Sequence, residues 1–153
     1  MRFKIQRSNL NYFYYFHNTG TSSYSKAIEL DPKEVYYWNA RGNAKYSLKQ
    51  YESAILDYSK AIEIAPNEVI YWNNRGNAKN ALKQYELAIL DYSKAIELKP
   101  HEAAYWNNRG NVKRDLGQHE SAILDYSKAI ELEPNEGAYW NGRGNAKLNL
   151  KQY

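Results

Sequence analysis

The chain has 153 residues, of which 43% are hydrophobic and 25% are charged, and its formal net charge is +4. These values predict one domain with a hydrophobic core and a solvated surface. The absence of cysteine excludes disulfides, thiolate nucleophiles and cysteine-based zinc sites, and no stretch approaches the roughly 20 apolar residues of a membrane span.

The first residues do not have the pattern of a secretion signal. Residues 1–16 open with basic side chains, but polar residues stand where a signal peptide needs an apolar run. Secretion is therefore disfavoured. We expect a cytoplasmic protein, because a chain without cysteine is compatible with a reducing compartment.

From Pro32 onwards the sequence repeats with a period of 34 residues. Three residue types mark the period: Trp38, Trp72, Trp106 and Trp140; Gly42, Gly76, Gly110 and Gly144; and Pro32, Pro66, Pro100 and Pro134. If Val35, Val69, Ala103 and Gly137 are taken as position 1, the full units are residues 35–68, 69–102 and 103–136, with no gap.

Each unit is predicted to form two helices, at positions 2–14 and 17–30, joined by a tight turn such as residues 48–51. Proline at position 32 ends the second helix. In the unit 69–102 the predicted core residues share helical faces: Tyr71, Ala78, Leu82, Ala88, Ile89, Tyr92, Ala95 and Ile96. Gly76, Ala88 and Ala95 stand where helices should cross, because small residues allow close approach.

The pattern of Trp, Gly, Tyr, Ala, Tyr, Ala and Pro at positions 4, 8, 17, 20, 24, 27 and 32 resembles the tetratricopeptide repeat. The resemblance covers at least residues 22–153. It implies an all-α fold, a right-handed alpha-alpha superhelix of antiparallel helix pairs whose first helices line a concave groove. It also implies a protein-interaction scaffold rather than an enzyme.

Both ends of the chain fit the repeat incompletely. Counting back 34 residues from Val35 places Phe3, Arg7, Leu10 and Tyr14 on the packed face, so residues 1–34 are interpreted as a degenerate repeat. Its second helix should begin late, near Ser22, because the preceding residues are poor helix formers. The alternative is an irregular tail that folds over the end of the stack.

Residues 137–153 contain only the first helix of a further repeat. Repeat arrays normally end in a polar-faced cap, whereas Trp140 and Gly144 should face a missing partner helix. This pattern predicts that the C-terminal helix has an exposed surface that is prone to association. The chain is then either a piece of a longer array or a module that associates through this end.

Asparagines recur on the face of the first helix that is opposite the core. They occupy positions 5, 9 and 6 of successive units: Asn39, Asn73, Asn107 and Asn141; Asn43, Asn77, Asn111 and Asn145, with Asn9 before them; and Asn74 and Asn108. An amide both donates and accepts hydrogen bonds, so these rows are predicted to bind the backbone of an extended or short helical peptide. The alternative at position 9 is a bond to a neighbouring helix or a solvated side chain.

The same face also carries the most variable residues. Positions 2, 12 and 13 differ between units, and the candidate specificity determinants among them are Tyr36, Tyr46, Asn80 and Arg114. Some members of the resembling family grip a terminal carboxylate with Lys and Arg at positions 2, 5 and 6. No Lys or Arg occupies these positions from Val35 onwards, which disfavours such a clamp.

A basic residue stands at position 7, within the packed face, where the resembling family usually has an apolar residue. The repeat arginines are Arg41, Arg75, Arg109 and Arg143, and the repeat aspartates at position 23 are Asp57, Asp91 and Asp125. A buried guanidinium must be paired, so we predict Arg–Asp pairs with a structural role.

Other classes of function find little support. A nucleic-acid-binding solenoid could use two lysine rows, Lys45, Lys79, Lys113 and Lys147 and Lys60, Lys94 and Lys128, but adjacent carboxylates argue against it. The histidines do not converge on a metal motif, and no catalytic set or cofactor loop is present. The main rival is a structural module that self-assembles into homo-oligomers through its uncapped terminal helices.

Overall fold

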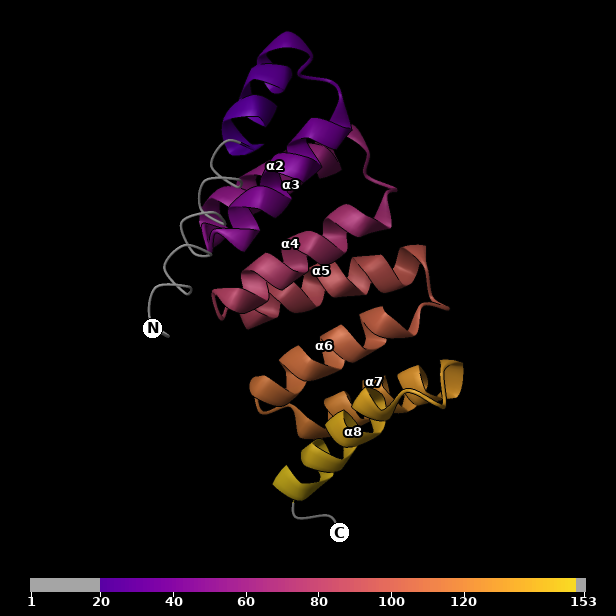
Figure 1. Ribbon diagram of the computed structural model, residues 1–153. Coiled ribbons are helices and arrows are strands. Elements are labelled where there is room, and N and C mark those ends of the chain that lie inside the picture. Colours follow the sequence, from indigo (N-terminus) through magenta and orange to yellow (C-terminus); the bar gives the residue numbers. More distant parts are fainter. Residues whose placement is uncertain (1–19, 151–153) are drawn as a thin grey trace, which may run out of the picture. The chain divides into compact units, whose positions relative to one another are not determined.

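The computed structural model describes residues 20–150 and divides the chain into two compact units, Met1–Pro66 and Asn67–Tyr153. Every regular element in the described range is an α-helix (Figure 1). In the first unit, residues 20–30 are helical and are followed by α2 (Val35–Ser47) and α3 (Tyr51–Ile64). The second unit contains α4 (Val69–Ala81), α5 (Tyr85–Leu98), α6 (Ala103–Asp115), α7 (His119–Leu132) and α8 (Gly137–Asn149).

The predicted helix pairs are confirmed. The first helices span positions 1–13 and the second helices positions 17–30, so the predicted bounds are met within one residue. The second helix of residues 1–34, expected to start near Ser22, is helical from residue 20, the first described residue. Burial of Ile28 in this helix supplies packing that outweighs weak local propensity. The predicted first helix of the degenerate repeat, with Asn9, lies outside the described residues.

The core of each pair is built around a tyrosine at position 24, the repeat tyrosine: Tyr58, Tyr92 and Tyr126. All three are at most 2% exposed, and the alanines at positions 20 and 27 beside them are fully buried. A Cβ atom added to the repeat glycine at position 8 would lie 2.6–3.1 Å from the ring in Gly42, Gly76 and Gly110. The predicted crossing of small residues is therefore confirmed, and the ring fills the space that glycine leaves.

Each first helix is also tied to the loop before it. The Trp Nε1 donates a hydrogen bond to the carbonyl of the proline six residues earlier, at 2.9 Å in Trp38–Pro32, Trp106–Pro100 and Trp140–Pro134. Proline ends the second helix and the indole then fixes the direction of the next one. The tryptophan row is therefore structural, although Trp140 remains 48% exposed.

The turn between the two helices of a pair needs one residue with left-handed backbone conformation. This residue is Lys49 (φ 60°), Lys83 (φ 58°) or Gly117 (φ 82°). A side chain with a Cβ atom costs about 1 kcal/mol or more in this conformation, whereas glycine adopts it freely.

We therefore expect Lys83→Gly to raise the urea midpoint of unfolding and Gly117→Lys to lower it. Both shifts should be modest, because the greater entropy of the unfolded chain with glycine partly offsets the relief of backbone strain. Equal destabilisation by both changes would contradict the role assigned to the turn.

Candidate peptide-binding face

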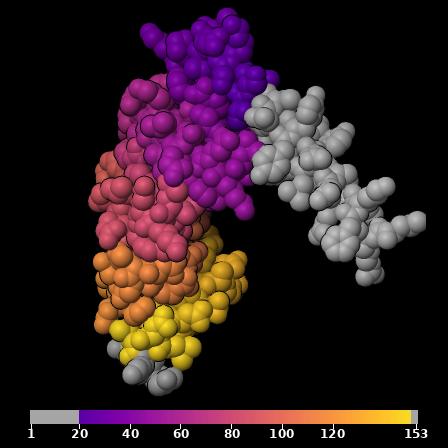
Figure 2. Space-filling model, turned by 90° about the vertical axis from the view of Figure 1, so that its left-hand side faces the viewer, coloured from indigo at the N-terminus to yellow at the C-terminus, as the bar shows by residue number. Residues whose placement is uncertain are grey.

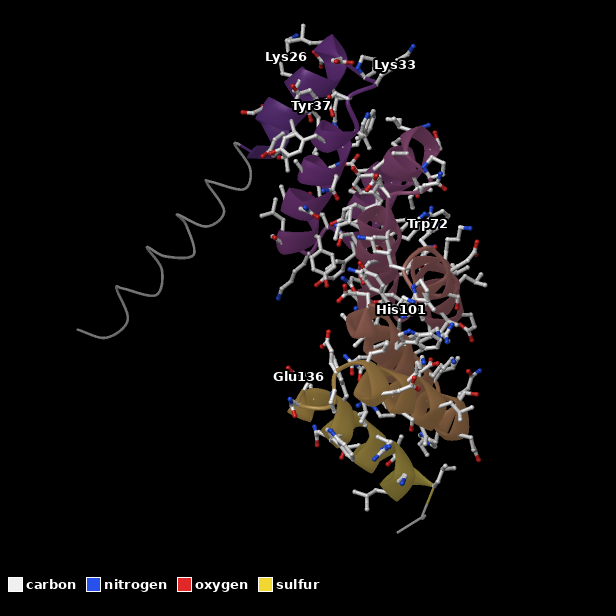
Figure 3. All side chains as sticks on the ribbon, turned by 90° about the vertical axis from the view of Figure 1, so that its right-hand side faces the viewer. Lys26, Lys33, Tyr37, Trp72, His101 and Glu136 are labelled. Atoms are coloured by element: carbon white, nitrogen blue, oxygen red, sulfur yellow. The ribbon has the colours of Figure 1, made fainter. Side chains whose placement is uncertain are left out.

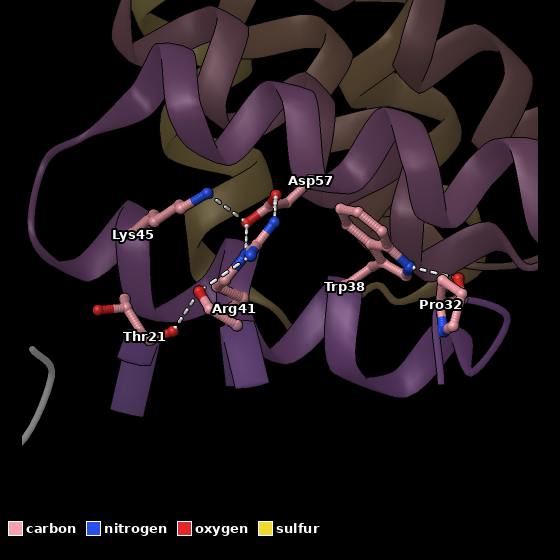
Figure 4. A network of polar contacts seen from close by, with 7 residues as sticks. Thr21, Pro32, Trp38, Arg41, Lys45 and Asp57 are labelled. Carbon is pink, nitrogen blue, oxygen red and sulfur yellow. Dashed lines mark hydrogen bonds and ion pairs between the residues drawn. The ribbon is translucent and has the colours of Figure 1, made fainter. Parts of the chain in front are cut away.

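The predicted Arg–Asp pairs are present in all three full repeats. Arg41 donates from Nε to Asp57 Oδ2 at 2.9 Å and from Nη2 to Asp57 Oδ1 at 2.7 Å (Figure 4). The same two-point contact joins Arg75 to Asp91 and Arg109 to Asp125. The repeat aspartates are only 2–3% exposed, so the pairs lie in the core as predicted.

A second cation completes each pair. The repeat lysine at position 11 places Nζ 2.7–2.8 Å from the carboxylate in Lys45–Asp57, Lys79–Asp91 and Lys113–Asp125. From the sequence these lysines were considered only as a possible nucleic-acid-binding row, and their pairing with aspartate was not predicted. The four-residue spacing from the arginine to the lysine could have indicated it, because this spacing places both side chains on one helical face.

The repeat arginine has two further neighbours. Its guanidinium lies 4.5–5.0 Å from the centre of the tryptophan ring three residues before it. Arg41 and Arg109 also donate at 3.0 Å to Ser25 and Ser93, which belong to the second helix of the preceding repeat. The cation therefore links two consecutive repeats.

The second lysine row is also paired. Lys60, Lys94 and Lys128 each lie 2.6 Å from the glutamate three residues later. Most lysines of the two rows that a nucleic acid could contact are thus paired with carboxylates. This pairing reduces the positive potential that binding to nucleic acid requires.

The asparagines at position 9 make the bond to a neighbouring helix that was the alternative at this position, because they contact the repeat tyrosines. The Tyr hydroxyl donates to Asn Oδ1 at 2.8 Å in Tyr58–Asn43, 2.6 Å in Tyr92–Asn77 and 2.8 Å in Tyr126–Asn111. Burial raises the pKa of Tyr126 to about 12, so this phenol remains a donor at neutral pH. The amide oxygen is therefore engaged by the core, and in Asn77 and Asn111 the amide nitrogen can still donate to a ligand.

The raised pKa of Tyr126 predicts a loss of stability in alkali. The unfolded phenol ionises near its ordinary value of 10.0, and the folded one only near 12. The stabilisation is thus complete below pH 10 and falls as the pH rises through about 12. In urea denaturation at a series of pH values, Tyr126→Phe should show a shallower decline than the wild type; parallel curves would contradict this assignment.

The asparagines at positions 5 and 6 bond to one another along the second unit. Asn108 donates to Asn73 Oδ1 at 3.1 Å, and Asn73 donates to Asn74 Oδ1 at 3.5 Å. These contacts connect α4 to α6 through side-chain amides. Asn107 is half-buried, whereas Asn141 and Asn145 on α8 are exposed.

The four candidate specificity residues have different surroundings. Tyr36 is 58% exposed and its ring meets Tyr24 edge-on at 6.4 Å. Tyr46 makes a similar contact with the ring of Tyr51 at 5.2 Å, and Asn80 is half-buried near the end of α4. Arg114 pairs with its neighbour Asp115 at 2.9 Å, which reduces the charge that it could present to a ligand.

Within residues 20–150, no group of three His, Asp or Glu side chains could hold a metal ion, and no helix has the length and hydropathy to cross a bilayer. His101 lies in the loop before α6 (Figure 3), and His119 begins α7. His17 lies outside the described range.

The family model of the tetratricopeptide repeat matches residues 35–68, 69–102 and 103–136. The chain therefore belongs to the tetratricopeptide repeat family, and its fold is the all-α helical solenoid that the sequence predicted. No curated protein is similar to it in sequence.

Several solved structures share this fold. The crystal structure of MamA is similar with a TM-score of 0.85 and 20% identity, over 99% of this chain and 86% of that one. The first tetratricopeptide domain of Spaghetti (RPAP3), bound to the HSP90 peptide SRMEEVD, gives a TM-score of 0.74 and 26% identity over 79% and 96%. The Sgt2 domain from Aspergillus fumigatus gives 0.72 and 31% over 78% and 80%.

Proposed function

We propose that this chain is a protein-interaction scaffold that binds an extended peptide along the asparagine-bearing face of its first helices. Family membership supports an interaction module, and the similar domain of Spaghetti was solved with a bound peptide.

The hydrogen bond from the repeat tyrosine to the asparagine at position 9 carries the proposal. It recurs at 2.6–2.8 Å in every full repeat and engages the amide oxygen. A peptide that meets Asn77 and Asn111 therefore meets their amide N–H groups, which suit its backbone carbonyl groups. Such contacts do not depend on the peptide's side chains, so selectivity is assigned to variable residues such as Tyr36, Asn80 and Arg114.

Asn77→Asp combined with Asn111→Asp tests the proposal. Aspartate keeps the oxygen that accepts from Tyr92 and Tyr126 but has no N–H group. A peptide selected from a displayed random library should bind the double variant at least about tenfold more weakly than the wild type, since two donors are lost. Asn73 is less suitable for this test, because it also accepts a bond from Asn108.

The matched control is Asn67→Asp with Asn135→Asp, two exposed loop positions that receive the same change in charge. The control should bind the selected peptide normally. Equal affinities for wild type, control and Asn77/Asn111 variant, measured by fluorescence anisotropy, would reject the asparagine face as the binding site.

The peptide SRMEEVD, which the domain of Spaghetti binds, should not bind this chain with comparable affinity. From Val35 onwards, positions 2, 5 and 6 provide no Lys or Arg for its carboxylates, and the repeat lysines of the full repeats are paired with aspartates. Isothermal titration with the free-acid and amidated peptides should detect no difference between them. Tight binding that depends on the free carboxylate would show that another basic site replaces the clamp.

Self-assembly is the second candidate, and it is favoured by the exposure of Trp140 (48%) and Leu148 (53%) on α8. A contact between unlike ends of two copies generates rings or filaments. Sedimentation over a range of concentrations tests this candidate, and a strict monomer would eliminate it.

A further inference from the structure

The second helix of each full repeat carries an exposed leucine at position 22. Leu56, Leu90 and Leu124 are 69%, 65% and 71% exposed. On α5, a turn of about 100° per residue places Leu90 almost opposite the buried Ala88 and Tyr92. These leucines therefore contribute little to the core of their own repeat. They are identical in the three full repeats, whereas positions 2, 12 and 13 of the first helices differ.

A negative residue stands one turn before this leucine and a positive residue one turn after it. Residues four apart share a helical face, and four residues rise about 6 Å along the axis. The glutamate and the lysine therefore flank the leucine about equally. We call positions 18, 22 and 26 of a second helix the outer stripe, which is Glu52–Leu56–Lys60, Glu86–Leu90–Lys94 and Glu120–Leu124–Lys128 in the full repeats.

An outer stripe is complementary to a second copy of itself in the antiparallel direction. A two-fold axis that passes between the two leucines, perpendicular to the helices, reverses the order of the charges in the other copy. Each glutamate then faces a lysine and the leucines face each other. In the parallel direction like charges meet, which is unfavourable. The charges of the stripe thus select both the partner and its direction.

The second unit presents two such stripes. Helices α5 and α7 run in the same direction, because both are antiparallel to α6 between them (Figure 1), so the same arrangement applies to both. Leu87 is 47% exposed one turn from Leu90 and enlarges the apolar part of the α5 stripe. Figure 2 shows the second unit, from pink through orange to yellow, as a closely packed body, so its outward side chains border solvent.

We propose that two copies of this chain form a symmetric dimer through the outer stripes of α5 and α7. Leu90 and Leu124 form the apolar centre of the contact, and Glu86 and Glu120 bind the lysines at position 26 of the other copy. The asparagine rows lie on the first helices and take no part in this contact. The dimer therefore presents two asparagine faces, and its formation does not depend on peptide binding.

The lysines of the stripe can still bind a second carboxylate. Lys94 Nζ lies 2.6 Å from Glu97 and Lys128 Nζ lies 2.6 Å from Glu131, but these glutamates are 68% and 67% exposed. Such solvated pairs contribute little, and an ammonium group has three donors. The glutamates at position 18 of α5 and α7 are exposed and form no ion pair with residues 20–150.

Sedimentation equilibrium of the full chain measures the association. The contact is smaller than a standard interface, so we expect a reversible dimer with a Kd of about 10–100 µM. Leu90→Ser combined with Leu124→Ser should raise the Kd at least about tenfold, because the apolar centre is lost. Both side chains are exposed, so the fold should persist by circular dichroism. Leu148→Ser on α8 replaces another exposed leucine and should leave the Kd unchanged.

Charge reversal tests the antiparallel pairing directly. Glu86→Lys with Glu120→Lys makes both stripes positive, and Lys94→Glu with Lys128→Glu makes both stripes negative. Each variant alone should dimerise at least about tenfold more weakly than the wild type, since like charges face each other. An equimolar mixture should form a one-to-one heterodimer with an affinity near that of the wild type, because opposite charges meet again.

The matched control for the charge change is Glu68→Lys with Glu102→Lys, two exposed positions before first helices. It should dimerise normally. Three results overturn the proposal. One is a strict monomer up to about 500 µM. Another is association that Leu148→Ser abolishes and the double leucine variant retains, which assigns the contact to α8. The third is the absence of heterodimers in the mixture of the two charge-reversed variants.

Discussion

Replacing Asp91 with alanine should lower the free energy of unfolding by about 3–5 kcal/mol, because Arg75 and Lys79 lose their shared carboxylate. The aspartate side chain is 3% exposed and the two cations 17% and 12%, so water compensates the loss poorly. Urea denaturation followed by far-ultraviolet circular dichroism measures the change.

Two further variants separate the buried cluster from ordinary surface charge. Arg75→Leu should also destabilise, since it leaves Asp91 with Lys79 alone. Glu97→Ala removes an ion pair with Lys94 in which the glutamate is 68% exposed, and it should cost well below about 1 kcal/mol. If Asp91→Ala is as mild as Glu97→Ala, the carboxylate is not a buried partner of the cations.

Gly76→Ala and Gly144→Ala should act in opposite directions although both place one methyl group at position 8. The new Cβ in Gly76→Ala would lie 2.9 Å from a carbon of the buried Tyr92 ring, and such overpacking costs about 1–3 kcal/mol. The same change at Gly144 meets open space and should stabilise α8 by up to about 1 kcal/mol, as alanine does in a helix.

The two glycine variants are compared by urea midpoint in the same full chain. Because the substitution and the repeat position are identical, the contribution of intrinsic helix propensity cancels. The difference between the two shifts in urea midpoint therefore measures the effect of the packed tyrosine ring. A similar shift in both variants would show that the ring can move aside and that glycine is not required for the crossing.

The helix pairs and the Arg–Asp pairs could be predicted because both follow from spacing along the chain. Proline sets the end of each second helix, and helical periodicity places the repeat arginine on the packed face, where it needs a counter-charge. Asp91 is sixteen residues after Arg75 and lies on the flank of the next helix's apolar stripe. When an arginine and an aspartate recur together in the core of each unit, each has few other groups with which it could pair.

The side-chain contacts on the asparagine face could not be predicted in the same way. The bond from Tyr92 to Asn77 depends on how deeply the ring enters the space above Gly76, and the bond from Asn108 to Asn73 depends on the rotation between successive first helices. Neither quantity is set by spacing alone. The binding role of these asparagines therefore remains a proposal that rests on their geometry.

The cluster of arginine, lysine and aspartate lies wholly within one 34-residue unit, as in Arg75, Lys79 and Asp91. A gene duplication or deletion of one such unit therefore adds or removes both cations together with their carboxylate. Across the junction between units the arginine donates to a serine, as from Arg109 to Ser93, and each full unit supplies the same serine. Changes in repeat number thus leave no buried charge without its partner, which favours arrays whose length can vary during evolution.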